Sequence, residues 1–135
     1  MQLSRRLLPA LLLFLALPAV ATAQSLAPTH GAGPTPSAVK GFRLTVGNPY
    51  KTPMTFLVLP MDAGFRRPVD GVEVLPPKVT LAPGFTRQVI LAFKIPQNSK
   101  ERTIGLCVQP EKLAGPVLPR VCGRYTGVRL TGMGG

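Results

Sequence analysis

Few residues of this chain are of the types that carry out chemistry. Its 135 residues include a single histidine, His30, and five acidic residues, which are Asp62, Asp70, Glu73, Glu101 and Glu111. General acid–base catalysis relies mostly on histidine or on paired carboxylates, and these acids are scattered over segments that we expect to be loops or polar strand faces. The sequence has no glycine-rich phosphate loop, nucleophile elbow or metal-ligand spacing. It therefore predicts a protein that is not an enzyme and that uses no metal and no cofactor.

The two cysteines, Cys107 and Cys122, are close in sequence. In an oxidising compartment such a pair favours a disulfide, and the alternative is a pair of buried free thiols. If the two flanking segments form an antiparallel hairpin with the cysteines opposite each other, Val108 faces Val121 and the apolar side chains of both segments share the other face of the sheet. One register thus gathers the apolar residues and brings the two sulfur atoms within reach of each other.

The first 23 residues have the composition of a secretory signal peptide. Arg5 and Arg6 provide a basic start, residues 7–17 are an apolar run, and Ala21-Thr22-Ala23 fits the small-residue rule for cleavage. The alternative is a membrane anchor, but the run is shorter than the roughly 20 apolar residues that a spanning helix needs. We therefore expect an exported, periplasmic protein with no stable membrane insertion.

The chain is strongly basic, with a formal net charge of +11 at pH 7, and removal of residues 1–23 with their two arginines would leave +9. In a cytoplasmic protein this charge would suggest nucleic acid as the partner, but export argues against that reading. Outside the cytoplasm we expect at most weak attraction to anionic envelope polymers such as lipopolysaccharide, or to acidic lipid head groups. The alternative is a solvated basic surface that has no ligand.

The elements that must position these residues are short strands. Residues 24–41 are rich in Pro, Gly, Ala, Ser and Thr, so we expect a flexible leader in which His30 is solvated. From Phe42 onward, apolar runs with period-two alternation are separated by turn residues about every ten positions. This pattern predicts an all-β fold, an antiparallel sandwich or barrel over residues 42–130 with a short tail at 131–135.

The stretch "VEVLPPKVTLAPGFTRQVIL", residues 72–91, resembles part of a known family. A strand that ends in two prolines is followed by a short strand, a Pro-Gly turn and a long alternating strand. Periplasmic pilus-assembly chaperones of the PapD-like group carry a similar block in their first immunoglobulin-like domain. The segments "FRLTVGNPYKTPMTFLV" and "KIPQNSKERTIGLCVQ" are similar to neighbouring strands of that domain. One subgroup also bridges its last two strands there by a disulfide, as Cys107 and Cys122 would.

The resemblance implies an immunoglobulin-like antiparallel β-sandwich of about seven strands that binds subunits of a pilus, a fimbria or another surface structure by β-strand addition. This sequence provides for one such domain, whereas the chaperones have two. In the family, an Arg on the first strand and a Lys near the last strand of the first domain hold the C-terminal carboxylate of the pilin. Here the candidate anchors are Lys40, Arg120 and Arg124, and no Arg lies between Gln24 and Val39.

Strand addition needs an edge strand whose N–H and C=O groups are unpaired. On the last expected strand the candidate contacts for a protein partner are Val121, Tyr125, Val128 and Leu130. For Val121 and Tyr125 the alternative is that they only complete the core. The alternative function is a non-catalytic immunoglobulin-like structural or accessory module of a cell-envelope complex.

Overall fold

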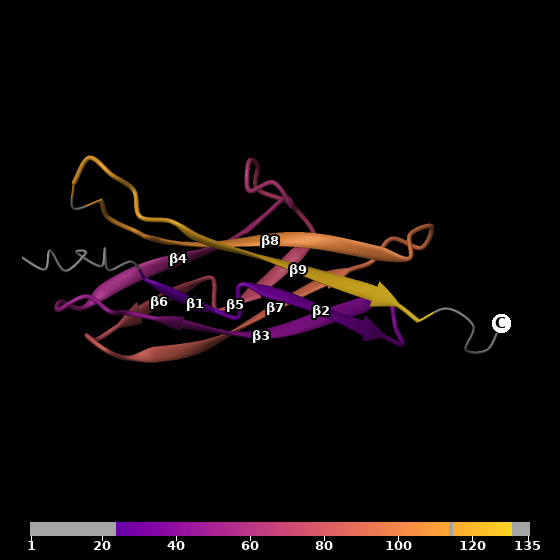
Figure 1. Ribbon diagram of the computed structural model, residues 1–135, viewed down its shortest axis with the longest axis horizontal. Coiled ribbons are helices and arrows are strands. Elements are labelled where there is room, and N and C mark those ends of the chain that lie inside the picture. The colour runs from indigo at the N-terminus through magenta and orange to yellow at the C-terminus, as the bar shows by residue number, and fades with distance from the viewer. Residues whose placement is uncertain (1–23, 114, 131–135) are drawn as a thin grey trace, which may run out of the picture.

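The computed structural model describes residues 24–113 and 115–130, and the regular elements in these two ranges are strands (Figure 1). The predicted signal peptide and the tail at 131–135 lie outside the described residues. Among the residues described, no helix has the length and hydropathy to cross a membrane. The nine strands are β1 (Ser25–Ala27), β2 (His30–Thr35), β3 (Val39–Gly47), β4 (Met54–Met61), β5 (Val72–Leu75), β6 (Lys78–Leu81), β7 (Thr86–Lys94), β8 (Glu101–Pro110) and β9 (Val121–Arg129).

The strands form two sheets that pack face to face in an elongated sandwich (Figure 1). Sheet A has the strand order β1-β3-β7-β5, and sheet B has the order β2-β9-β8-β4-β6. The period-two alternation of the sequence explains the core, because every second side chain of a strand points between the sheets. The prediction of an immunoglobulin-like β-sandwich is therefore confirmed. The fully buried apolar side chains include Leu44, Val46, Phe56, Val58, Val89, Leu91, Phe93, Ile104, Leu106, Val108 and Tyr125.

The prolines between residues 72 and 91 mark changes of direction. β5 ends at Leu75 in sheet A and β6 begins at Lys78 in sheet B, so Pro76-Pro77 lies where the chain crosses from one sheet to the other. Since proline has no N–H to give to a ladder, such a crossing is a suitable place for it. Gly84 then turns the chain into β7 with a φ of 77°, a conformation that favours glycine.

The hairpin of β8 and β9 has the register that the sequence predicted. Cys107 pairs with Cys122 and Val108 pairs with Val121, while the buried Ile104 lies opposite Tyr125. The cysteines form a disulfide with a Cα–Cα distance of 4.1 Å, so the alternative of free thiols does not hold here. The two cysteines are 15 positions apart in the sequence, and a bridge that closes a loop of this length contributes roughly 3 kcal/mol to the free energy of unfolding in the chain-entropy model.

The expectation of a flexible leader over residues 24–41 is wrong for the part that forms β1, β2 and the start of β3. β1 pairs antiparallel with β3 in sheet A. The chain then changes sheet, and β2 pairs in parallel with β9 in sheet B over His30–Thr35. These two additional strands account for the difference between the expected seven and the nine observed.

Close packing explains why this segment is so poor in large side chains. A Cβ atom at Gly31 would lie 3.1 Å from the rings of both Phe42 and Tyr125, so β2 lies directly on an aromatic pair whose ring centroids are 5.6 Å apart. The Tyr125 hydroxyl donates a hydrogen bond to the carbonyl of Pro28 (2.6 Å). The glycine at position 31 therefore reflects close packing of the strand rather than flexibility of a linker.

This packing predicts different outcomes for neighbouring substitutions in β2. Gly31→Val should lower the free energy of unfolding by about 1–3 kcal/mol, because it overpacks the space between the two rings. Ala32→Val is the matched control, because Ala32 is exposed and valine suits a strand, so it should change stability by less than about 0.5 kcal/mol. Urea denaturation of the two variants measures both effects. Equal stability of the two variants would contradict the packing described here.

Candidate functional site

At the beginning of β9, the edge of sheet B is not covered by β2. β2 pairs with β9 from Arg124 to Arg129. The first three residues of the strand, Val121–Gly123, have no strand partner on that side among the described residues. We call this segment, residues 121–123, the open edge of β9.

Hydrogen bonds farther along β9 show which backbone groups face the open side. The N–H of Arg124 donates to the carbonyl of Thr29 (2.9 Å), and the N–H of Arg129 donates to Lys100 on the β8 side (2.7 Å). Backbone groups of successive strand residues alternate in direction, so those of even-numbered residues point toward β2. By the same alternation, the N–H and C=O of Cys122 point to the open side. Those of Arg120, which immediately precedes β9, point the same way if the extended conformation continues to that residue.

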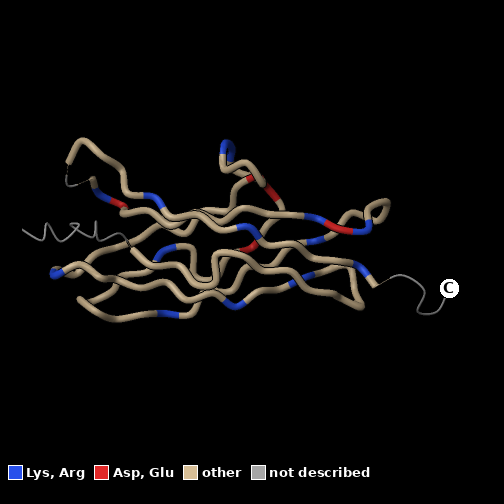
Figure 2. The backbone as a smooth tube through the Cα atoms, in the orientation of Figure 1, with Lys and Arg blue, Asp and Glu red and all other residues tan. Residues whose placement is uncertain are grey.

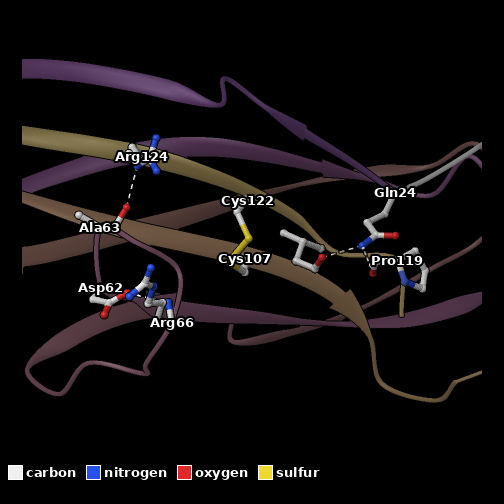
Figure 3. Close-up of a disulfide and its surroundings, with 9 residues drawn as sticks. Gln24, Asp62, Ala63, Arg66, Cys107, Pro119, Cys122 and Arg124 are labelled. Atoms are coloured by element: carbon white, nitrogen blue, oxygen red, sulfur yellow. Dashed lines mark hydrogen bonds between the residues drawn. A yellow bond between two sulfur atoms is a disulfide. The ribbon is translucent and has the colours of Figure 1, made fainter. Parts of the chain in front are cut away.

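The open edge has apolar side chains within it and before it. Val121, in the edge, is half-buried, and the preceding β8–β9 loop (residues 111–120) carries the exposed Leu113, Val117 and Leu118. The end of this loop is held by the buried Gln24, whose amide donates to the carbonyls of Val108 (2.6 Å) and Pro119 (2.8 Å) (Figure 3). A backbone edge with apolar neighbours has the features that a partner strand needs.

Three of the four expected edge contacts do not lie at an open edge. Tyr125 is a buried core residue, so the alternative reading holds for it. Val128 is paired with Pro34 of β2, and the N–H of Leu130 donates to Thr35 (3.0 Å). Val121 alone remains beside backbone groups that are open. The sequence did not reveal this, because the segment that covers the edge was expected to be a flexible leader.

The guanidinium of Arg124 is held by the β4–β5 loop. Its Nε donates to the carbonyl of Ala63 (2.7 Å; Figure 3). Its Cζ lies 4.6 Å from the centroid of the Phe65 ring. The loop is shaped by Asp62, whose carboxylate accepts from the N–H of Arg66 (2.8 Å). That hydrogen bond lowers the pKa of Asp62 below its usual value. Arg124 thus fastens a loop over the outer face of sheet B.

His30 lies in β2, next to Arg124 in the parallel register, and its side chain is exposed as expected. Together with Thr103 and Thr126, the two residues line a shallow hollow of about 490 Å³ on the outer face of sheet B. Among the described residues, no group of three or more His, Cys, Asp or Glu side chains could hold a metal ion.

The three predicted anchors are not brought together. Arg120 is exposed just before the open edge, Arg124 is held by the loop, and Lys40 lies on β3. Lys40 instead belongs to a group of half-buried cations at the opposite end of the sandwich, with Arg102 of β8 and Arg129 of β9. We call these three residues the cation cluster.

Each residue of the cation cluster donates at least one hydrogen bond to a backbone carbonyl. Arg102 donates to Lys94 (2.9 Å), Arg129 to Ile95 (2.6 Å) and Pro96 (3.2 Å), and Lys40 to Pro34 (3.3 Å). The only salt bridge within the described ranges joins Lys78 and Glu111, so no acidic side chain balances these charges there.

The buried Nε of Arg129 has no hydrogen-bond partner among the residues that the structure describes. Two guanidinium groups and an ammonium without a carboxylate are suited to bind an anion.

The sequence contained a signal for this cluster that was not used. In the hairpin register that pairs Cys107 with Cys122, Arg102 pairs with Gly127. Arg102 therefore continues the inward-facing series of Ile104 and its apolar neighbours, at the end of the strand. A basic residue at that position indicates a cation at the end of the hydrophobic core.

Comparison with known proteins supports the fold. No model of a protein family matches the chain, and no curated protein matches it. Among solved structures, the E. coli chaperone DraB is similar over 84% of this chain and 57% of its own, with 20% identity and a TM-score of 0.64. A structure of the Salmonella enterica SafA pilin in complex with the SafB chaperone gives 16% identity, 83% and 57% coverage and a TM-score of 0.66.

A PapD-like domain of human CEP192 is also similar, with 14% identity, 81% and 86% coverage and a TM-score of 0.59. The chain thus spans 57% of the length of the two bacterial structures and most of the human domain. At these identities the similarity shows the fold alone, which is the PapD-like immunoglobulin-like sandwich. The resemblance drawn from residues 72–91 is confirmed at that level.

The buried hydroxyl of Tyr125, which holds the chain where it crosses between the sheets, should make the stability of the protein depend on pH. Burial raises the pKa of Tyr125 to about 12 from an ordinary value of 10.0. Because the folded state favours the protonated hydroxyl, the contribution of Tyr125 to the free energy of unfolding is complete below pH 10. It is lost as the pH rises toward 12.

Urea denaturation between pH 9 and pH 12 measures this loss. Tyr125→Phe should be less stable by about 1–2 kcal/mol at neutral pH, because the Pro28 carbonyl loses its donor, and it should lose less stability above pH 10 than the unchanged protein. Identical alkaline profiles for the two proteins would contradict this role of the hydroxyl.

Proposed function

We propose that this protein is a chaperone-like protein of the periplasm that binds a subunit of a pilus, a fimbria or another surface structure by β-strand addition. The observation that carries the proposal is the open edge of β9, with its outward-facing N–H and C=O groups and its exposed apolar border. The PapD-like fold that the chain shares with structures of periplasmic pilus chaperones is consistent with this role.

The open edge is built on a rigid support. The Cys107–Cys122 disulfide ties the middle of the edge to β8, and the Gln24 amide fixes the carbonyl of Pro119 just before it. An edge that is already ordered loses little conformational entropy when a partner strand adds to it. Specificity would then come from Val121 and from the exposed Leu118 that precedes it in the loop.

Capture of a partner's carboxylate is a separate matter. From Gly123 to Arg129 the strand rises roughly 20 Å, and β2 covers that whole distance. A short strand added at the open edge therefore does not reach the cation cluster unless β2 moves away. In the proposed mode of binding, the affinity comes from the backbone and the apolar border, without Lys40 as an anchor.

A second candidate function has an observation in its favour. β2 occupies six of the nine residues of β9, which leaves a short edge of the kind that natural sheets use to avoid pairing with other chains. This favours a non-catalytic structural or accessory module of a cell-envelope complex, in which the open edge has no partner.

A substitution at Arg120 separates the two functions. Arg120→Pro removes an N–H group that faces the open side, and it lies outside the ladder with β8, which ends at the Val108–Val121 pair. Arg120→Gln is the matched control, because it removes the charge but keeps the N–H. The protein and both variants are purified from the periplasm of their own cells, and the proteins that accompany them are quantified by mass spectrometry.

We expect a surface subunit to accompany the unchanged protein and Arg120→Gln, and its amount to fall at least tenfold with Arg120→Pro, which corresponds to a loss of about 1.4 kcal/mol. Equal recovery with all three proteins would exclude strand addition at the open edge. Absence of any surface subunit from all three preparations would favour the structural module.

A further inference from the structure

Three loops and the start of the described chain meet at one end of the sandwich. These are Gln24, the β3–β4 loop (residues 48–53), the β6–β7 loop (residues 82–85) and the β8–β9 loop, and we call this part the N-terminal end. The N–H of Asn48 donates to Phe85 (3.0 Å), and the N–H of Gly84 donates to Asn48 (2.8 Å), which ties two of the loops together. In Figure 1 all three loops lie at the left end of the molecule.

The N-terminal end carries the most exposed large apolar side chains among the described residues. Val117 is 75% exposed, Phe85 64% and Leu113 61%. They stand on two separate loops, and Leu113 and Val117 line the same hollow of about 260 Å³ there. Large apolar side chains displayed in this way on an exported protein mark a contact surface.

Cations surround these apolar side chains. Lys51, Arg87, Lys112 and Arg120 are exposed on or beside the three loops, and each exposed apolar loop residue has a cation within three positions in the sequence. The acidic residue at this end, Glu111, is already paired with Lys78 (2.7 Å). Figure 2 shows blue segments for Lys and Arg on these loops, with a red acidic segment next to one of them.

We propose that the N-terminal end docks onto the surface of an anionic lipid bilayer. Exposed apolar side chains on these loops can insert into the deformable boundary between head groups and acyl chains, where the surrounding cations meet anionic lipids. A protein partner would have to provide separate pockets for residues on two loops, together with an acidic rim. The proposal concerns peripheral contact and does not depend on strand addition.

The position of Gln24 provides an independent argument. The sequence before Gln24 contains the apolar run at residues 7–17, and the six residues 18–23 between them span at most about 20 Å. While that run is in a membrane, before the expected cleavage after residue 23, the N-terminal end is the part of the sandwich held next to the bilayer. The loops that carry exposed apolar and basic side chains are thus those nearest the membrane.

The test uses the exported protein, with its first residue established by N-terminal sequencing, and vesicles of phosphatidylcholine with or without about one third phosphatidylglycerol. Co-sedimentation at physiological salt measures the partition coefficient. We expect binding to the anionic vesicles and at least tenfold weaker binding to pure phosphatidylcholine, because each cation near the surface contributes about fivefold.

Matched variants locate the contact. Phe85→Thr, Leu113→Thr and Val117→Thr together should reduce binding at least tenfold, and Lys51→Gln, Arg87→Gln and Lys112→Gln together should reduce it by a similar factor or more. The apolar control combines Val39→Thr, Leu75→Thr and Ile90→Thr on the exposed face of sheet A, and the charge control combines Arg43→Gln, Lys94→Gln and Lys100→Gln. Both controls should bind less than threefold more weakly than the unchanged protein.

Fluorescence gives a second readout. The chain contains no tryptophan, so Phe85→Trp introduces a single reporter at the N-terminal end, and Ile90→Trp places one on sheet A as a control. Anionic vesicles should shift the emission of the first to shorter wavelength and leave that of the second unchanged.

Three outcomes would overturn the proposal. One is no binding to anionic vesicles, and another is an equal loss of binding in the variants and their controls, which would mean diffuse charge attraction. The third is vesicle binding that the N-terminal-end variants retain while they lose a protein partner, which would make these loops a protein contact. None of these results decides strand addition, which the Arg120 variants test separately.

Discussion

The architecture depends on how the chain crosses from sheet A to sheet B between β1 and β2. The Tyr125 hydroxyl donates to Pro28, and Gly31 allows β2 to lie against the rings of Tyr125 and Phe42. This contact holds β2 in sheet B, where it covers β9 from Arg124 onward. The place at which the chain changes sheet therefore determines how much of β9 stays available to a partner.

Two surfaces lie at opposite ends of β9. The open edge lies at the N-terminal end, beside the β8–β9 loop, while the cation cluster lies at the other end of β9. Open backbone groups and cations without an acidic partner thus lie at opposite ends of one strand. The N-terminal end combines an open edge with apolar and basic loops, so a bound subunit and a membrane surface would meet the protein at neighbouring places.

Much of the fold could be predicted because strands with one buried face leave a strong period-two signal. The register of β8 and β9 followed from Cys107 and Cys122, since one alignment satisfied both the sulfur atoms and the apolar faces. β1 and β2 could not be predicted in this way, because a strand packed against aromatic rings uses glycine and leaves no apolar alternation. The candidate site was predicted only in part. Val121 belongs to the open edge, but Tyr125 and Val128 lie where β2 covers β9, and the sequence analysis did not identify Arg102.

Amide hydrogen exchange, followed residue by residue by NMR, tests most directly the claim that β2 covers β9 and leaves its start open. In the free protein we expect slow exchange at Arg124, Thr126 and Val128, whose N–H groups face β2, and fast exchange at Cys122, whose N–H faces the open side. Val121 is an internal reference, because its N–H faces β8. Protection of Cys122 equal to that of Arg124, or fast exchange at all four even-numbered positions, would contradict the account.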